Sequence, residues 1–541
     1  MAPPCDVAIT STTRIQAESP SQTSCIVPLS LLDATTAEFA LTSAVWLFDR
    51  PRLASQQPFD LTAHLASTLS TTLDAYPQWA GQIEAVQTVD GQGPAEATEI
   101  PVHARRFGRL FAKFGDKRDP GVAFSAATCA ITLDELYPAE RRVHHTFWDS
   151  QAWLNRFTSQ ADIANAFQPD VQDTNGLLKP VMAIQVTTLA CSGFALAAKI
   201  AHPLADITAL VTFMNDWATI SRTSILQLER CRLCPVFNPC KVDAAAARNI
   251  DAPEPAAEVL QRSATMPMHR YDWWRDVSGC PWPTNIPEPF QKAKMEAAGT
   301  AMPWSEWETG SPVSCSIVRL SAEQVEFLWA SANKESGQRL SRHDAVLAHI
   351  WSSINRARRL GTDTGPVHCD LTCGVRPVLQ LGGSFIGSPI VIINIQALGA
   401  EVAGEAASLG SIATRVRGTI EQVLKPEPIG DHLHSLAYEK SPQRIWQAFL
   451  GRRYILVTTW ARAGVYNIDF GFASEIRYVD GIVPDMDGIV VIKEAPPIVA
   501  AEASDTSWTR SGVDVSIRIR AEDMERLLAD PLLFPSFPLL C

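Results

Sequence analysis

One histidine and one aspartate in this chain are spaced so that they could support proton transfer. The segment HPLAD places His202 and Asp206 four residues apart. A neutral imidazole is suited to accept a proton near pH 7. The aspartate lies across the same tight turn, where its charge can hold the geometry of the turn without touching a substrate. An isolated pair with this spacing also occurs where a histidine is simply buried and hydrogen-bonded in a core. The surrounding elements are therefore needed to distinguish a catalytic histidine from a structural one.

Those surrounding elements predict a rigid corner. Residues 181–190 are rich in β-branched side chains, and Gly193 separates them from a second apolar run at 194–201, so two strands are expected. The chain turns at Pro203. Apolar residues then follow at helical spacing, at Ile207, Leu210, Val211, Met214 and Trp217. The imidazole is therefore predicted to sit on fixed backbone between a strand and an amphipathic helix.

The rest of the chain alternates strands and helices in both halves. Strands are predicted at 42–48, 367–375, 389–396 and 454–460, and helices at 61–73 and 412–424. Two further helices are predicted to begin at N-cap residues: one at Ser321, with Glu323 as the third position of the turn, and one at Ser341, ahead of the helix to Leu360. Such alternation is typical of an α/β protein, here with two domains of similar size.

Composition narrows the class of protein. The 541 residues carry a net charge of −12 and are 46% hydrophobic, which predicts large cores and argues against nucleic acid or an anionic membrane as partner. The polar N-terminus lacks the apolar core of a signal peptide, and no apolar run is long enough to span a membrane. The 12 cysteines fit reduced thiols better than a disulfide scaffold. These features predict a soluble, monomeric, cytoplasmic enzyme.

Five segments, one of which holds both candidate residues, form an ordered set of motifs along the chain. The chain contains PLSLLD near residue 30, YPQWAGQI near residue 80, HPLAD at 202–206, SRHDAVLAHIW at 341–351 and TTWARAGVYNIDFGF at 458–472. In this order they resemble the BAHD acyltransferases, CoA-dependent enzymes that move an acyl group onto a hydroxyl or an amine. The resemblance covers about residues 26–535. The Trp- and Pro-rich stretch in the middle is most similar to fungal members that act in secondary metabolism, of which trichothecene acetyltransferases are the familiar type.

The resemblance implies a fold and a division into domains. Two similar chloramphenicol-acetyltransferase-like domains are expected, with mixed sheets and flanking helices, joined by a long crossover. The boundaries expected from the sequence are a flexible N-terminus at 1–25, an N-terminal domain at 26–240, a crossover at 241–312 and a C-terminal domain at 313–541. A segment at about 469–497 is expected to cross back and complete the sheet of the first domain.

The resemblance also assigns roles to individual residues. His202 corresponds to the general base, and Asp206 to an aspartate that pairs with an arginine, here Arg376, and holds the corner. Asp469 and Gly471 resemble structural residues, although Phe472-Ala473 replaces the Trp-Gly of plant members. With less support, three residues are expected near the substrate or the oxyanion of the reaction intermediate, namely Thr459, Trp460 and Ser388, the last of which replaces an asparagine of the family.

The implied reaction moves an acyl group, acetyl by analogy, from acyl-CoA to a hydroxyl of a secondary metabolite such as a terpenoid or polyketide. Transfer is expected to be direct, within a ternary complex, with no bound cofactor and no metal; CoA and the acceptor would enter from opposite ends of a tunnel. A condensation-type enzyme that uses carrier-protein thioesters and a non-catalytic ligand-binding relative remain alternatives. A hydrolase is less favoured because no GxSxG motif is present.

Four other motifs have simpler interpretations. HHTFWD at 144–149 matches the HHxxxD of condensation domains but lacks a preceding buried strand. VPDMDGIVVIKE at 483–494 imitates a calcium loop, yet begins with Val483 and lies between strands, so a β-turn is predicted. The cysteines at 231, 234 and 240 lack the further ligands of a zinc site. The Gly-rich stretch 381–388 lacks the GK[ST] of a phosphate loop.

Overall fold

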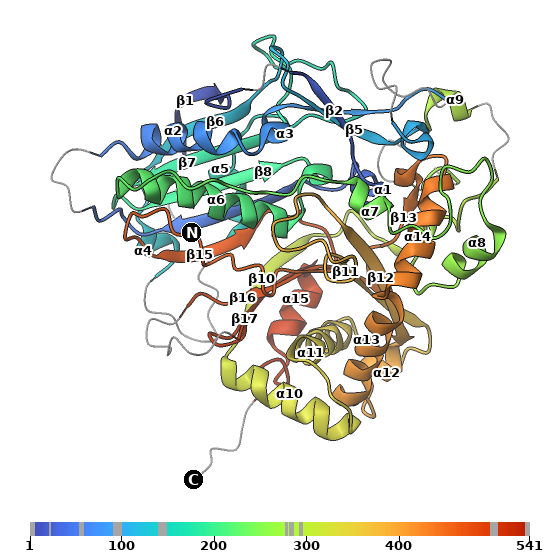
Figure 1. Ribbon diagram of the computed structural model, residues 1–541. Helices are drawn as coiled ribbons and strands as arrows, with labels where there is room; N and C mark the ends of the chain where they lie inside the picture. Colours follow the sequence, from blue (N-terminus) through green and yellow to red (C-terminus); the bar gives the residue numbers. More distant parts are fainter. Residues whose placement is uncertain are drawn as a thin grey trace.

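Two mixed β-sheets with helices on their outer faces make up most of the molecule (Figure 1). The computed structural model describes residues 6–20, 23–53, 59–89, 100–138, 149–275, 280, 286–291, 296–497 and 507–535. Within these residues the two large sheets have six strands each, and smaller sheets of three and two strands accompany them. The alternation of strands and helices predicted for both halves of the chain is confirmed.

The first sheet carries the predicted corner at the end of one of its central strands. Its pairs are antiparallel except for β6 and β7, which run parallel. In spatial order the strands are β1 (Ala8–Ile15), β6 (Val122–Cys129), β7 (Met182–Leu189), β8 (Phe194–Ile200), β3 (Thr42–Phe48) and β15 (Ile476–Gly481). Apart from the edge strand β1, these strands are almost entirely buried, which explains their continuous apolar runs.

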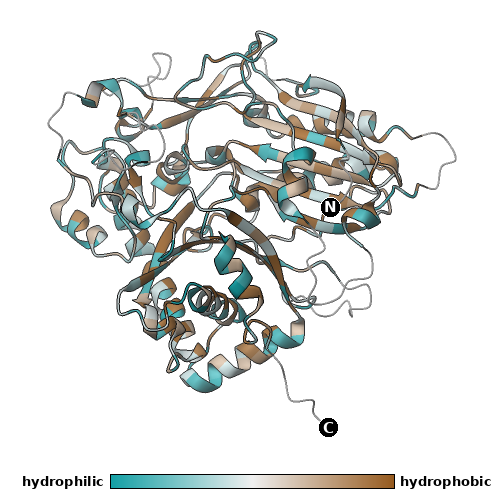
Figure 2. Ribbon diagram, turned by 180° about the vertical axis from the view of Figure 1, so that it is seen from behind, coloured by the Kyte–Doolittle hydropathy of each residue, from teal (hydrophilic) through white to brown (hydrophobic). Residues whose placement is uncertain are grey.

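The second sheet is built from the C-terminal half. β14 runs parallel to both of its neighbours, and the remaining pairs are antiparallel. In spatial order the strands are β10 (Val313–Leu320), β17 (Val513–Arg520), β16 (Ile489–Glu494), β14 (Tyr454–Thr459), β11 (Pro366–Gly374) and β12 (Ile390–Leu398). Figure 2 shows that the strands through the middle of the molecule are mostly hydrophobic, while the helices outside them expose hydrophilic faces.

Helices cover both sheets. The long helices α2 and α6 pack together on the first sheet, and α10, α11, α13 and α15 lie beneath the second (Figure 1). The longer helices are α2 (Leu61–Leu73), α5 (Ser150–Phe157), α6 (Ile207–Ile225), α8 (Ala257–Ala264), α10 (Ala322–Ser336), α11 (Arg342–Ala357), α13 (Leu409–Val423), α14 (Pro426–Tyr438) and α15 (Ala521–Leu528). The shorter ones are α1 (Leu31–Thr35), α3 (Pro77–Ala80), α4 (Leu133–Leu136), α7 (Cys240–Asp243), α9 (Glu288–Gln291) and α12 (Gly399–Ala403).

Two predicted helix starts are borne out, with one correction. Ser341 caps α11, and Ser321 caps α10 through its side chain. The residue that completes the capping box of α10 is Gln324, not Glu323, because the reciprocal bond needs the third residue after the cap to reach back to the cap's N–H.

The crossover packs against both halves of the chain. It forms β9 (Tyr271–Asp272), which pairs with β13 (Ile445–Trp446) of the C-terminal half. Asp251 accepts a hydrogen bond from the backbone N–H of His103 in the N-terminal half at 2.7 Å. The three-stranded sheet of β2 (Cys25–Pro28), β5 (Leu110–Phe114) and β4 (Gln82–Ala85) lies on the N-terminal side.

Two expectations about the domains need correction. Residues 8–15, expected to be flexible, form the edge strand β1; their alternating Thr, Ser and Ile suit a half-exposed edge, which produces little hydrophobic signal. The segment that returns to the first sheet is β15 alone, seen in orange-red beside the blue and green strands of Figure 1. β16 pairs with β14 and β17 in the second sheet, so the return ends before it. The division into domains otherwise stays a prediction.

None of the described helices is both long enough and apolar enough to span a lipid bilayer.

Candidate active site

His202 is fixed between a buried strand and a capped helix, as the sequence predicts. β8 ends at Ile200, residues His202–Leu204 form a single 3₁₀ turn, and α6 begins at Ile207. The carboxylate of Asp206 caps α6 by accepting a hydrogen bond from the backbone N–H of Ala209 at 2.9 Å. The corner therefore has little freedom to move the imidazole.

The imidazole contacts one polar and one aromatic side chain. Nδ1 of His202 lies 2.9 Å from Oγ of the fully buried Ser388, which comes from the loop before β12. The ring of Phe39 meets the imidazole edge-on, with centroids 5.6 Å apart. In the tautomer that donates from Nδ1 to Ser388, the other ring nitrogen, Nε2, keeps a lone pair and can accept a proton. Ser388 thus touches the histidine itself.

A buried ion pair connects the His202 corner to the loop between β11 and β12 of the second sheet. Arg376 forms a two-pronged contact with Asp206, in which Nη2 and Oδ1 are 2.9 Å apart and Nη1 contacts Oδ2. Nη2 of Arg376 also donates to the carbonyl of Gly387 at 3.1 Å, and the N–H of Asp206 donates to the same carbonyl. The pair expected from the resemblance is present, and it holds the loop that carries Ser388.

Asp33 supports the same loop, and the sequence analysis did not identify it. The side chain is buried, and its Oδ1 accepts a hydrogen bond from the backbone N–H of Ser388 at 2.6 Å. Its Oδ2 accepts from the N–H and Oγ of Ser30, which completes the capping box of α1. Burial raises the pKa of Asp33 to about 6 against the lowering effect of these hydrogen bonds. The Ser-x-x-Asp spacing of PLSLLD was the available signal.

We expect Asp33→Ala to lower kcat about tenfold, because the N–H groups of Ser388 and Ser30 lose their acceptor and each unsatisfied group costs about 1–3 kcal/mol. Asp33 is a positioning residue in this arrangement, so the KM values for both substrates should change little. Asp33→Asn keeps one oxygen for Ser388 and should lose less activity. Steady-state kinetics with a parallel thermal unfolding measurement would check this, and an unchanged kcat in Asp33→Ala would contradict it.

The pH dependence of activity should report the imidazole. Burial lowers the pKa of His202 below 6.5, and the nearby Asp206 opposes part of that effect. The histidine is then neutral at pH 7 and becomes protonated only as the pH falls through the lowered pKa. We expect kcat/KM to rise along an acid limb with an apparent pKa below 6.5 and to level off by pH 7. Because Asp33 titrates nearby, the profile should be repeated in Asp33→Asn; a limb centred above 6.5 in both would contradict the assignment.

The DFGFA motif lies at the opposite end of α6 from His202. Oγ of Ser221, in the last turns of α6, donates to the carbonyl of Phe470 at 2.8 Å, and Arg222 donates to the carbonyl of Asp469. Gly471 has a φ of +83°, and a Cβ there would approach Cα of Arg222 to 2.9 Å. Ser221 lies 14 residues after Ile207, so the motif lies about 21 Å along the helix axis from the corner. These contacts fit the structural role expected for Asp469 and Gly471.

Thr459 and Trp460 do not meet the imidazole through any contact seen here. Oγ1 of Thr459 accepts a hydrogen bond from the N–H of Ala461 at 3.3 Å, a local turn contact. Trp460 is buried in the core around the first sheet, where its ring packs against Gly481. Their suggested role near the oxyanion finds no support in these contacts.

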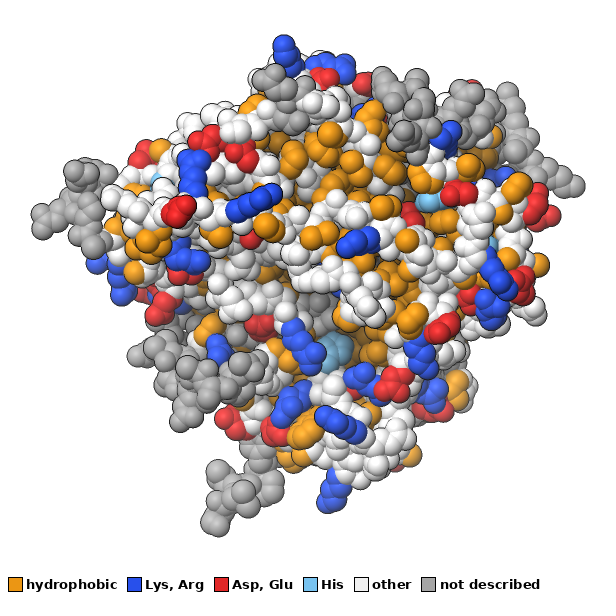
Figure 3. Space-filling view, in the orientation of Figure 1, with side chains coloured by type: hydrophobic (Ala, Val, Ile, Leu, Met, Phe, Trp, Pro, Cys, Tyr) orange, Lys and Arg blue, Asp and Glu red, His pale blue; other side chains and the backbone are white. Residues whose placement is uncertain are grey.

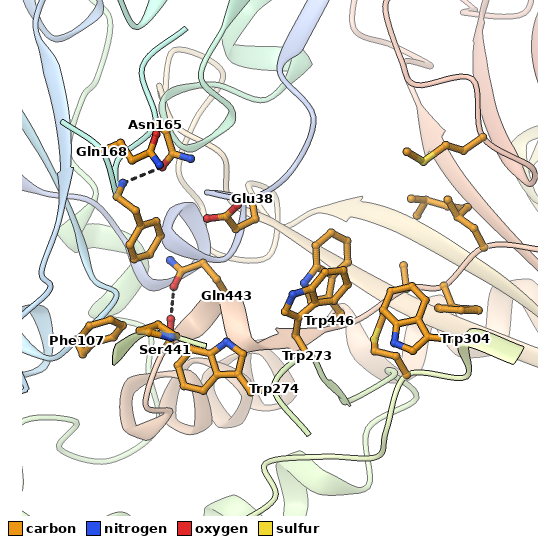
Figure 4. A pocket seen from close by; sticks show the side chains of 18 of the residues that line it. Glu38, Phe107, Asn165, Gln168, Trp273, Trp274, Trp304, Ser441, Gln443 and Trp446 are labelled. Atoms are coloured by element: carbon orange, nitrogen blue, oxygen red, sulfur yellow. Dashed lines mark hydrogen bonds between the residues drawn. The ribbon is translucent and has the colours of Figure 1, made fainter. Parts of the chain in front are cut away.

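An aromatic cavity opens next to the Phe39 side of the site. Its volume is about 840 Å³, and its wall includes tryptophans of the crossover and of the C-terminal half. The ring of Trp446 in this wall lies 5.5 Å from that of Phe39, which in turn meets His202. Figure 4 shows Trp273 and Trp446 stacked in the middle of the cavity, with Glu38 and Gln443 beside them. The aromatic side chains of the wall are Phe107, Phe167, Trp273, Trp274, Trp304, Trp307, Trp446 and Phe449.

A second cavity of about 530 Å³ is strongly basic. It is formed around the start of α11 and the residues after β14, and its ionisable lining residues are Arg339, Arg342, His343, Arg417, Arg462 and Glu421. Arg417 is paired with Asp344, whereas Arg339 and Arg462 form no ion pair with any described residue. Figure 3, drawn in the orientation of Figure 1, shows Lys and Arg side chains gathered around a histidine on the lower half of the visible face. Such a cavity is suited to a polyanion.

Within the described residues, the competing motifs form no metal or catalytic site. Asp149 of the HHTFWD segment caps α5, and residues 144–148 lie outside the described residues. In the calcium-like segment, Asp487 is buried against Arg358 at 2.7 Å and Asp485 pairs with Arg518. Both carboxylates therefore form ion pairs with arginines. No group of three or more metal-binding side chains was found among the residues that the structure describes.

Comparisons with known proteins agree on the family. The chain matches the Transferase family over residues 5–92 and 119–528. Among curated proteins it is 25% identical over 509 residues to "Acyltransferase AFT15-1" of Alternaria alternata, covering 91% of this chain and 90% of that protein. The resemblance to a fungal member is thereby confirmed.

Solved structures share the fold at low sequence identity. Vinorine synthase aligns with a TM-score of 0.60 at 15% identity, covering 96% of each chain. F. graminearum TRI101, crystallised with coenzyme A and deoxynivalenol, aligns with a TM-score of 0.60 at 16% identity, covering 94% of this chain and 98% of that one. The predicted α/β fold class, with two domains like those of these acyltransferases, is confirmed. The chain therefore belongs to the BAHD acyltransferases of the Transferase family.

Proposed function

We propose that this protein transfers an acyl group from acyl-CoA to a hydroxyl of a small acceptor, with His202 as the general base. The observation that carries the proposal is the half-buried imidazole whose Nδ1 is engaged by Ser388 at 2.9 Å, which leaves Nε2 available as a proton acceptor. His202 is held on both sides, by the end of β8 and by the ion pair of Asp206 with Arg376. This arrangement suits a base that must be neutral and correctly aimed.

The reaction then balances without an enzyme nucleophile. Nε2 of His202 takes the hydroxyl proton of the acceptor while that oxygen attacks the carbonyl carbon of the thioester. The C–S bond breaks as the new C–O bond is completed. The departing CoA thiolate receives the proton from the imidazolium, so His202 returns to its neutral form. Acetyl-CoA is the first donor to test, by analogy with the family.

The two cavities supply candidate positions for the two substrates. The aromatic cavity is large enough for a polycyclic acceptor such as a terpenoid or polyketide alcohol, since ligand sites commonly occupy about 300–1,000 Å³. The basic cavity, with the unpaired charges of Arg339 and Arg462, suits the phosphates of CoA. Leu456 of β14 lines the first cavity and Arg462, beyond the end of β14, lines the second. This spacing supports entry of the substrates from opposite ends.

The test is release of CoA thiol from a panel of acyl-CoAs, with hydroxylated terpenoids and polyketides as acceptors and mass spectrometry of the products. Formation of an acylated product that depends on acyl-CoA is the expected result. Thiol release without an acylated product would indicate hydrolysis instead. Product formed only from carrier-protein thioesters would replace the CoA proposal with a condensation-type activity.

A further inference from the structure

The aromatic cavity has a negative charge and no positive one. Among the described side chains that line it, Glu38 and Glu288 are acidic, and none is a lysine, arginine or histidine. A neutral acceptor would need neither carboxylate. The remaining polar groups of the wall are amides and a hydroxyl, so the charge of the cavity comes from these two residues.

Of the two cavity carboxylates, Glu38 is the one that lies next to a residue in contact with His202. It lies in the turn after α1, directly before Phe39, whose ring packs on His202. The cavity carboxylate therefore belongs to the same turn as the aromatic ring that contacts the imidazole. Figure 4 shows the Glu38 carboxylate projecting above Gln443, with Asn165 and Gln168 on one side and Trp446 on the other.

Glu38 has no neutralising partner among the described residues. Its side chain forms no hydrogen bond or ion pair with the described part of the chain, and it is accessible from the cavity. The neighbouring amide of Gln443 is already used, because its Nε2 donates to the carbonyls of Ala34 and Gly108 at 2.6 and 2.9 Å. Burial raises the pKa of Glu38, as expected for a carboxylate that lacks a counter-charge.

The basic residues behind the wall have their own partners. Arg444 lies over the ring of Trp274 and forms a two-pronged ion pair with Asp272, with distances of 2.8 and 2.6 Å. Arg270 pairs with Glu439 at 2.6 Å. Neither arginine lines the cavity. Among the described residues, no basic side chain is therefore placed to neutralise Glu38, which leaves its carboxylate available to a cation in the cavity.

The tryptophan wall is suited to supply the rest of a cation site. Trp273 stacks on Trp446 with centroids 5.2 Å apart, and Trp304 meets Trp273 edge-on at 5.3 Å. Tryptophan faces attract organic cations more strongly than other aromatic faces do, and most strongly where water is excluded. A carboxylate beside such faces distinguishes an ammonium group from a neutral group of equal size.

We propose that the acceptor carries a protonated or quaternary amine, separate from the reacting hydroxyl, which binds between Glu38 and the tryptophans of the cavity wall. This inference rests on the proposed function for its reaction, but the binding step can be measured without acyl transfer. The acceptor would thus be an amino alcohol with an apolar body. The cation would fix the acceptor by a group that does not react, which leaves its hydroxyl free to face His202.

The test compares two probes of equal shape and different charge. The cation is benzyl(2-hydroxyethyl)dimethylammonium, and its neutral carbon isostere is 3,3-dimethyl-4-phenylbutan-1-ol. Binding to the full-length wild type, Glu38→Gln and Glu288→Gln is followed by quenching of intrinsic tryptophan fluorescence and by calorimetry, with no acyl-CoA present. Glu288→Gln is the matched control, because Glu288 also lines the cavity and is also exposed, but lies on α9 and not beside Phe39.

We expect wild type to bind the cation about tenfold more tightly than the isostere, and Glu38→Gln to lose most of that preference. Glu288→Gln should keep it within about threefold. Equal affinities of the two probes, a preference that survives in Glu38→Gln, or no binding of the cation at millimolar concentration would each overturn the inference. Because these readouts need no CoA, their failure leaves the acyl-transfer assay to judge the proposed function separately.

Discussion

Replacement of His202 by alanine is expected to lower kcat by at least about a hundredfold, because general-base assistance contributes roughly 10²–10⁴ to the rate. The imidazole has a single close polar partner among the described residues, Ser388 at 2.9 Å, and no other histidine touches the corner. Rates of product formation from acyl-CoA and acceptor, measured by mass spectrometry under saturating conditions, check the prediction.

Two further variants separate loss of the base from loss of structure. His202→Asn keeps a donor that can reach Ser388 but removes the base, so it should be as inactive as His202→Ala while unfolding at a temperature close to that of wild type. His64→Ala is the matched control, since His64 is also half-buried and hydrogen-bonded to a serine, Ser221 at 2.9 Å, but lies on α2. It should retain most activity. If His202→Asn forms product within threefold of the wild-type rate, His202 is not the base.

Replacement of Arg376 by alanine is expected to lower the free energy of unfolding by about 3–5 kcal/mol, the usual range when one partner of a buried ion pair is removed. Asp206 is buried and would keep its charge with only the N–H of Ala209 as a close donor. The carbonyl of Gly387 would lose a donor as well, and with it the loop that carries Ser388 would be less constrained. Activity should therefore fall even at temperatures where the variant is folded. Denaturant unfolding and kinetics of the folded variant measure the two effects.

A matched exposed pair provides the control for Arg376. Arg222 and Asp469 form an ion pair 3.5 Å long at the other end of α6, and their side chains are 39% and 60% exposed. Exposed pairs are worth about 0–1 kcal/mol, so Arg222→Ala should change stability little. Equal losses in the free energy of unfolding would contradict the prediction, because they would show that the buried ion pair stabilises the protein no more than the exposed one.

Much of the fold could be predicted from the sequence because it depends on local pattern. The buried strands β3 and β8 and the amphipathic helices α2 and α6 produce strong apolar periodicities, and their positions agree with those predicted. Capping serines marked the starts of α10 and α11. The edge strand β1 was missed because half-exposed strands carry polar residues on both faces.

The candidate site could be predicted only in part, because its partners come from distant parts of the chain. Asp33 lies 355 residues from Ser388, which it holds, so only folding brings them together. Glu38 gave no signal, since its lack of a counter-charge is a property of the cavity and not of neighbouring residues. The tryptophans of the crossover could equally have covered a core, and only the tertiary structure turned several of them toward a cavity.

Two features could be recognised from the sequence alone: the order of motifs that indicates the family, and the HPLAD corner with the strand before it and the helix after it. Local periodicity and capping depend on residues that are close together in the sequence, so they can be recognised without coordinates. Only the folded structure shows that Ser388 contacts His202, that DFGFA lies at the far end of α6, and that Glu38, without an ion-pair partner among the described residues, lines a cavity with several tryptophans. Those features depend on contacts between side chains that are far apart in the sequence. Such contacts form, and stabilise the protein, only when the chain is folded.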